Sequence, residues 1–81
     1  MTPREQLQSA LTDPEAYPFH QIQRLIEELG FKLVSMHRLH NVLSHPRISE
    51  LVCLQNVNSR AKPYQIQSFL TLIDQYHLGE T

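Results

Sequence analysis

The chain has 81 residues and a formal net charge of −1 at pH 7, and this length predicts one small domain with a single two-layer core. An apolar content of 41% is ordinary for a globular protein, and no uncharged stretch approaches the roughly 20 residues of a membrane span. The N-terminal segment MTPREQLQ lacks the apolar centre of a signal peptide. We therefore expect a cytoplasmic protein that makes no membrane contact.

The first 17 residues predict a helical extension followed by a linker. Residues 3–11 can form a short helix with Pro3 at its first position. Pro14 and Pro18 then interrupt the helical pattern, as two prolines in five residues are typical of a linker. The main domain is therefore expected to cover residues 18–81.

The first helix of the main domain is predicted over residues 18–29. Its apolar residues recur at helical spacing and form one stripe: Phe19, Ile22, Leu25, Ile26 and Leu29. Gly30 follows where a helix commonly ends on a residue with left-handed backbone.

Three strands are predicted next, over residues 32–37, 40–45 and 50–55. In the first, alternation places Leu33 on one face and Val34 with Met36 on the other. The short connections favour an antiparallel meander. Cys53 lies in an apolar part of the third strand, so we expect a core position, and a lone cysteine excludes an internal disulfide.

Residues 56–62 are polar and predict a loop, after which Pro63 opens a last helix that Gly79 ends. The apolar stripe of this helix consists of Ile66, Phe69, Leu70, Ile73 and Tyr76. The predicted fold class is α+β in the order α-β-β-β-α, with a three-stranded antiparallel sheet. Both helices should cover one face of the sheet, and the other face stays open to solvent or a ligand.

Residues 30–46, reading GFKLVSMHRLHNVLSHP, contain the strongest candidate for a functional site. His40 begins a strand just after a tight turn, where its side chain can act on a ligand that lies across a sheet. Imidazole titrates near neutral pH and can give or take a proton. A polar surface histidine without function is the alternative.

This stretch resembles the HicA family of toxin-antitoxin ribonucleases, and the resemblance covers roughly residues 19–78. It is carried by ELGFKLV at the first helix end, by the histidine hairpin ending in His-Pro, and by KPYQIQSFL in the last helix. A small cyanobacterial-type branch of the family is similar in more detail, at Leu54-Gln55-Asn56 and at Lys62-Pro63-Tyr64-Gln65. The family fold is similar to a double-stranded-RNA-binding domain.

The resemblance implies a metal-independent mRNA endoribonuclease that uses His40 and needs no cofactor. The expected partners are mRNA and an antitoxin protein, and the oligomeric state stays open. Residues 32–62 carry five cationic side chains and one carboxylate, Glu50. This positive segment can attract a polyanion locally. The residues expected to contact RNA are Lys32, Arg38, Arg60, Lys62 and Tyr64.

One departure from the family concerns the hairpin turn. The family motif is Gly-Ser-His, and here Arg38-Leu39 stands before His40. Arginine is strained where glycine supplies a positive φ, and leucine replaces a small hydroxyl. Two alternatives therefore remain open: an RNA-binding module of the same fold that has lost cleavage, and a protein-docking module.

Several other side chains have competing interpretations. His37 and His40 have H-x-x-H spacing, but on a continuous strand residues three apart point to opposite faces, so only a turn could bring them together. No cysteine or carboxylate cluster completes a coordination shell, and we expect no metal site. His45 is expected to end its strand, with phosphate contact as the alternative. Tyr64 belongs to the helix start assigned to RNA, although its spacing from Phe69 and Tyr76 also fits a core position.

Overall fold

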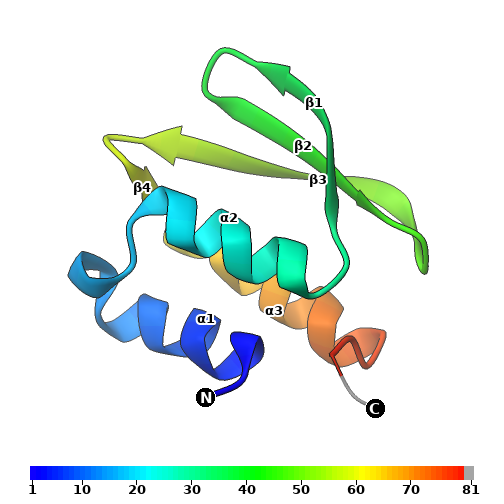
Figure 1. Cartoon of the computed structure of the whole chain (residues 1–81), viewed down its shortest axis with the longest axis horizontal. Coiled ribbons are helices and arrows are strands. Elements are labelled where there is room, and N and C mark those ends of the chain that lie inside the picture. The colour runs from blue at the N-terminus through cyan, green and yellow to red at the C-terminus, as the bar shows by residue number, and fades with distance from the viewer. Residues whose placement is uncertain (80–81) are drawn as a thin grey trace.

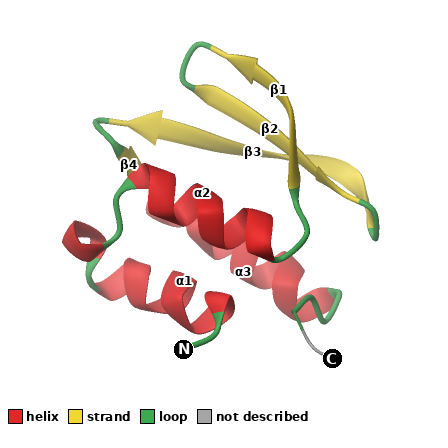
Figure 2. Ribbon diagram, viewed as in Figure 1, coloured by secondary structure: helices red, strands yellow, loops and turns green. Residues whose placement is uncertain are grey.

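The structure of the protein is a computed structural model that describes residues 1–79. The end of the predicted main domain, at residue 81, lies outside the described residues. The elements, in chain order, are α1 (Pro3–Thr12), the 3-10 turn η1 (Pro14–Ala16), α2 (Phe19–Glu28), β1 (Lys32–His37), β2 (His40–His45), β3 (Ile48–Val57), β4 (Arg60–Ala61) and α3 (Pro63–Gln75). Figures 1 and 2 show their arrangement.

The strands form an antiparallel sheet in the order β1-β2-β3-β4, with the helices on one side of it (Figure 2). The α+β class and the antiparallel meander are therefore confirmed. The strand number was wrong, because the sheet in the described residues has four strands rather than three. Helix α1 lies farthest from the strands (Figure 1).

The core lies between the sheet and the helices. Phe31 and Phe69 meet edge to face at its centre, with ring centroids 5.1 Å apart, a favourable geometry for aromatic pairs. The predicted stripes of both main helices are buried, except that Tyr76 is only partly covered. From the strands, Leu43, Ile48 and Leu54 complete the contact with the helices.

Helix α2 ends as its sequence predicts. Gly30 has a φ of 102°, a left-handed conformation that side chains with a Cβ rarely adopt. A Cβ at this position would also lie 2.7 Å from Nε2 of His45. Glycine is thus required both by the left-handed backbone and by the close approach of the His45 ring. It lets the chain turn directly from α2 into β1.

The first hairpin has the predicted strand limits but not the predicted faces. A β-bulge between Leu33 and Ser35 shifts the register of β1, since an extra residue reverses the alternation beyond it. Leu33 lies opposite Leu43, and Met36 lies opposite Asn41, so Leu33 and Met36 share a face. The prediction that they point to opposite faces was wrong.

Residues 56–62 were predicted as a loop and instead extend the sheet. Strand β3 continues to Val57, and the short strand β4 pairs with it after a turn at Asn58 and Ser59. Both turn residues have positive φ, 52° and 63°, as a two-residue hairpin turn of type I′ requires. The carbonyl of Ser59 accepts a hydrogen bond from the first amide of α2, at Phe19 (2.8 Å), so this turn also fixes the helix start.

Two smaller predictions about this half of the chain were wrong. Cys53 is exposed, because it lies opposite Val42 and points away from its buried neighbour Leu54. Helix α3 ends at Gln75 and not at Gly79, and the left-handed residue of its C-terminal motif is His77, with a φ of 52°. The amide of Leu78 then donates to the carbonyl of Ile73 (3.0 Å), which is the hydrogen bond of a Schellman motif.

The N-terminal helix packs against the other helices and does not cover the open face of the sheet (Figure 1). Leu7 and Ala10 are buried in the common core. Arg4 donates two hydrogen bonds to the Asp74 carboxylate of α3, at 2.6 and 2.8 Å, and this contact lowers the pKa of Asp74. Among the described residues, no helix has the length and apolar content needed to cross a membrane.

Candidate functional site on the open sheet face

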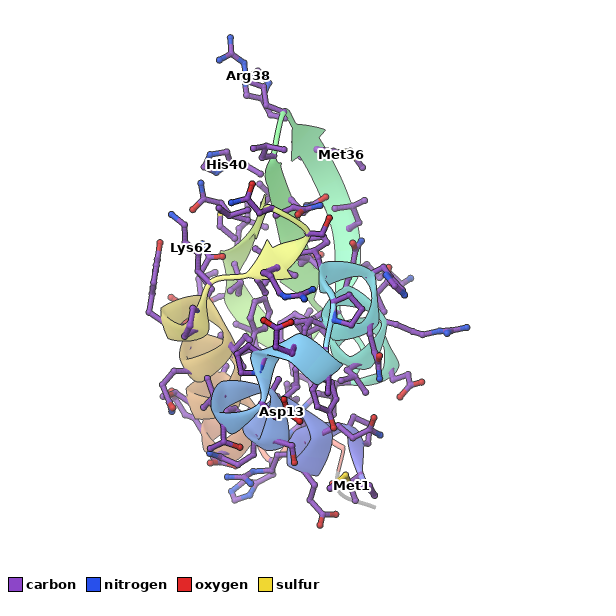
Figure 3. The ribbon with its side chains drawn as sticks, turned by 90° about the vertical axis from the view of Figure 1, so that its left-hand side faces the viewer. Met1, Asp13, Met36, Arg38, His40 and Lys62 are labelled. Carbon is purple, nitrogen blue, oxygen red and sulfur yellow. The ribbon has the colours of Figure 1, made fainter. Side chains whose placement is uncertain are left out.

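Polar side chains form a row across the open face of the sheet. His37 on β1 pairs with His40 on β2, and His40 pairs with Gln55 on β3. Lys62 follows β4 directly and extends from the same side of the molecule as His40 (Figure 3). Paired residues point to the same side of a sheet, so these four polar side chains form one row, His37–His40–Gln55–Lys62.

Figure 3 shows that His40 and Lys62 extend from the same side of the molecule. Met36 extends from the opposite side, and Arg38 points away from the body of the protein at the hairpin tip. Neighbouring strands are about 4.8 Å apart, so β1 and β4, the outermost strands of the row, both lie within about 10 Å of His40. A nucleotide-sized ligand could therefore reach His40 and Lys62 together.

The turn before His40 contains a residue with left-handed backbone. Arg38 has a φ of 55°, in the left-handed region that glycine adopts freely. Leu39 is 58% exposed beside His40, and its carbonyl accepts a hydrogen bond from the Asn56 amide (3.0 Å). The hairpin tip is thus bound to β3, which gives His40 a defined place.

His40 has a hydrogen-bond partner, Gln55, that was not predicted as a site residue. The side-chain nitrogen Nε2 of Gln55 lies 3.0 Å from Nε2 of His40. The main-chain amide of Gln55 donates to Oε1 of Gln65 (2.7 Å), and Gln65 is buried in the first turn of α3. Neither glutamine can be recognised from the sequence as part of a site, because polar residues are common in strands and helices. Their contacts become visible only when the strands are paired in the structure.

The predicted RNA-contacting residues near the row are Arg38, Arg60, Lys62 and Tyr64. Arg60 makes an ion pair with Glu15 at 3.3 Å, and such an exposed pair is worth little and opens easily. Tyr64 is 63% exposed, so the core interpretation was wrong for this residue. The ammonium of Lys62 lies 5.7 Å from the centre of the Tyr64 ring, within cation–π range.

Lys32 is the one predicted contact that the structure keeps away from His40. It begins β1 and pairs with Ser44, whereas His40 pairs with His37 at the other end of the same strand. Counted along β2, which has no bulge in this stretch, Ser44 and His40 are four residues apart, about 13 Å at the usual rise. A short ligand at His40 would not reach Lys32.

The H-x-x-H pair is closer in space than its spacing suggests, because the turn makes His37 and His40 cross-strand partners. Among residues 1–79, however, no group of three or more potential metal ligands occurs.

His45 is buried in the core, and phosphate contact there is excluded. Its Nε2 lies 3.0 Å from the Leu29 carbonyl, and its Nδ1 accepts from the Arg47 amide (3.1 Å). The ring also packs edge-on against Phe31, with centroids 5.0 Å apart. His45 therefore joins the end of α2 to the sheet rather than simply ending its strand.

The row combines an exposed imidazole, an amide that orients it and an ammonium on the same face. Imidazole can transfer protons near neutral pH, and nearby cations can stabilise phosphate charge. The arrangement suits a phosphodiester ligand better than an apolar one. Comparison with known proteins found no family model, no curated protein and no solved structure that matches this chain.

Proposed function

We propose that the protein is a HicA-like RNA-binding protein and a metal-independent mRNA endoribonuclease. The observation that carries this proposal is the position of His40: exposed on the open sheet face, held by Gln55 and on the same side as Lys62. In this proposal His40 transfers a proton during attack of the RNA 2′-hydroxyl on the adjacent phosphate. Arg38, Arg60 and Lys62 bind the phosphate charge.

The fold supports the proposal without establishing it. A sheet with helices on one face leaves the other face free for a nucleic acid, as in the double-stranded-RNA-binding-like fold that the family resemblance implies. Tyr64 is exposed next to Lys62 and can stack on an unpaired base, the usual route to binding single-stranded RNA. The proposed substrate is therefore a single-stranded segment of mRNA, and an antitoxin that covers this face is the proposed regulator.

A second candidate function is RNA binding without cleavage. The observation in its favour is Leu39, which is large and exposed beside His40 where the family has a serine. A leucine side chain at this point can obstruct the close approach of an RNA backbone. The cations and Tyr64 would bind RNA in either case, so only an assay of cleavage separates the two.

The test is cleavage of end-labelled single-stranded RNA by the purified protein in EDTA. His40→Ala should abolish cleavage, as general acid–base catalysis contributes about 10²- to 10⁴-fold. His20→Ala is the matched control, since His20 is an exposed histidine on α2, and it should cleave like the wild type. Equal cleavage by the His40→Ala protein would refute the proposal.

A second variant separates the nuclease from the binding module. If the wild type binds RNA but does not cleave it, Arg38→Gly and Leu39→Ser are introduced together. Cleavage gained by this double variant, and lost again with His40→Ala, would identify a degenerate nuclease. A protein that neither binds nor cleaves RNA, before or after these changes, would rule out both candidates.

A further inference from the structure

Two imidazoles lie side by side on the open sheet face. His37 and His40 flank the two-residue turn Arg38-Leu39 and are cross-strand partners in the β1–β2 register. Both side chains are exposed and point to the same side of the sheet, from Cα atoms about 4.5–5.5 Å apart. The turn thus brings two groups that can each transfer a proton to one place.

Cleavage of RNA by its own 2′-hydroxyl requires two proton transfers at one phosphate. A base takes the proton of the 2′-hydroxyl as this oxygen attacks phosphorus, and an acid protonates the 5′-oxygen as its bond to phosphorus breaks. The attacking and leaving oxygens lie roughly in line, on opposite sides of the phosphorus. In the proposed function His40 is the base, so the proton for the leaving oxygen has to come from a second group.

We propose that His37 is a second catalytic residue, the general acid that protonates the leaving 5′-oxygen while His40 takes the 2′-hydroxyl proton. This inference rests on the proposed function. His40 starts neutral and becomes an imidazolium, and His37 starts as an imidazolium and becomes neutral. The bond from the 2′-oxygen to phosphorus forms as the bond to the 5′-oxygen breaks, which gives a 2′,3′-cyclic phosphate and a free 5′-hydroxyl. Exchange of one proton each with water returns the pair to its starting state.

The other groups near His40 are less suited to this role. Arginine and lysine side chains ordinarily stay protonated at neutral pH, so Arg60 and Lys62 can hold phosphate charge but do not readily give up a proton. Tyr64 lies beside Lys62, and the row places Lys62 on the flank of His40 that faces away from β1. His37 occupies the β1 flank, which leaves a phosphate over the row with an imidazole on each side of its reacting oxygens.

The experiment compares two forms of the scissile linkage in otherwise identical single-stranded RNAs. One has the ordinary bridging 5′-oxygen, and the other has sulfur at that position. A thiol has a pKa of about 8.5, whereas a hydroxyl resembles water, with a pKa of about 15.7. Sulfur can therefore leave as a thiolate without a proton, which removes the need for a general acid and keeps the need for a base.

His37→Ala should lower kcat on the oxygen linkage by about 10²- to 10⁴-fold and should cleave the sulfur linkage within about threefold of the wild-type rate. His40→Ala should be impaired on both linkages, because the base is needed in either case. His20→Ala is the matched control, since His20 is an exposed histidine of α2, and it should equal the wild type on both. His37→Gln should behave like His37→Ala, and the urea midpoint of each variant reports whether the fold is kept.

Normal cleavage of the oxygen linkage by His37→Ala would overturn the inference and leave His40 and the proposed function in place. A loss in His37→Ala that sulfur does not restore would also overturn it, because His37 would then act in binding or folding rather than as the acid. Wild-type cleavage of the sulfur linkage alone would mean that the protein has a base and no acid, which again refutes the role of His37. If the wild type cleaves neither linkage, the inference is refuted together with the proposed function.

Discussion

At the scale of single residues, the hairpin tip next to the candidate site contains one strained backbone position. Arg38 adopts a left-handed φ of 55°, which costs a residue with a Cβ about 1–2 kcal/mol. The strand pairing on both sides and the hydrogen bond between Leu39 and Asn56 hold the tip in this shape. Such strain persists only where the surroundings determine the backbone.

Arg38→Gly should therefore stabilise the protein by about 0.5–1 kcal/mol. Glycine removes the left-handed penalty, and its extra freedom in the unfolded chain offsets part of the gain. The free energy of unfolding in urea is the measurement. Leu39→Gly is the matched control in the same turn: Leu39 has a negative φ, so only the entropic loss of about 0.5–1 kcal/mol applies. Equal destabilisation by both variants would contradict the argument.

Gly30→Ala should destabilise the protein by about 1–3 kcal/mol, the usual range for a strained backbone. The residue has a φ of 102°, and the added Cβ would lie 2.7 Å from the buried His45 ring. Urea unfolding again gives the value, with the exposed helical position Gln67→Ala as control. An unchanged unfolding midpoint in Gly30→Ala would mean that His45 can move, which its two main-chain hydrogen bonds oppose.

At the scale of elements, the sequence predicts what local patterns determine. The limits of β1 and β2, the stripe of α2 and the glycine after it follow from alternation, helical spacing and turn chemistry. The bulge at Val34, strand β4 and the exposure of Cys53 depend on how strands pair, which no local pattern specifies. The same reason applies to the site: His40 stands out by its turn, whereas Gln55 becomes recognisable only when the pairing brings it to His40.

The contact of α1 with α3 predicts a pH dependence of stability. Hydrogen bonds from Arg4 lower the pKa of Asp74 below its ordinary value of about 3.8. The unfolded chain then binds the proton more readily than the folded one, so this contribution is present above the ordinary value and is lost as the pH falls through the lowered pKa.

Asp74→Asn should therefore lower the urea midpoint at pH 7 and lose its effect in acid. The side chains are exposed, so the difference should be small and should shrink further in high salt. Asp13→Asn serves as control, because Asp13 makes no side-chain capping hydrogen bond, and its effect should not follow this pH dependence. A difference between wild type and Asp74→Asn that grows toward low pH would have the wrong sign for the proposed linkage.

At the scale of the whole molecule, charge is distributed unevenly around a net value of −1. Arg38, Arg60 and Lys62 lie at the end of the sheet that carries His40, and Lys32 and Arg47 lie at the other end. Two cationic ends separated by the length of a strand cannot act on one short ligand. RNA that binds at His40 should therefore interact with Arg38, Arg60 and Lys62 alone.

If the protein binds RNA as proposed, this separation predicts the salt dependence of that binding. Contact with three cations should give a slope of log K against log salt of about −2, at roughly −0.7 per phosphate contact on a single strand. Lys62→Ala should make the slope shallower by about 0.7, whereas Lys32→Ala, the matched lysine about 13 Å from His40 along the strand, should leave it unchanged. Titration of a labelled short single-stranded RNA at several salt concentrations gives all three slopes. If Lys32→Ala flattened the slope and Lys62→Ala did not, RNA would bind at the opposite end of the sheet, and His40 would no longer be within its reach.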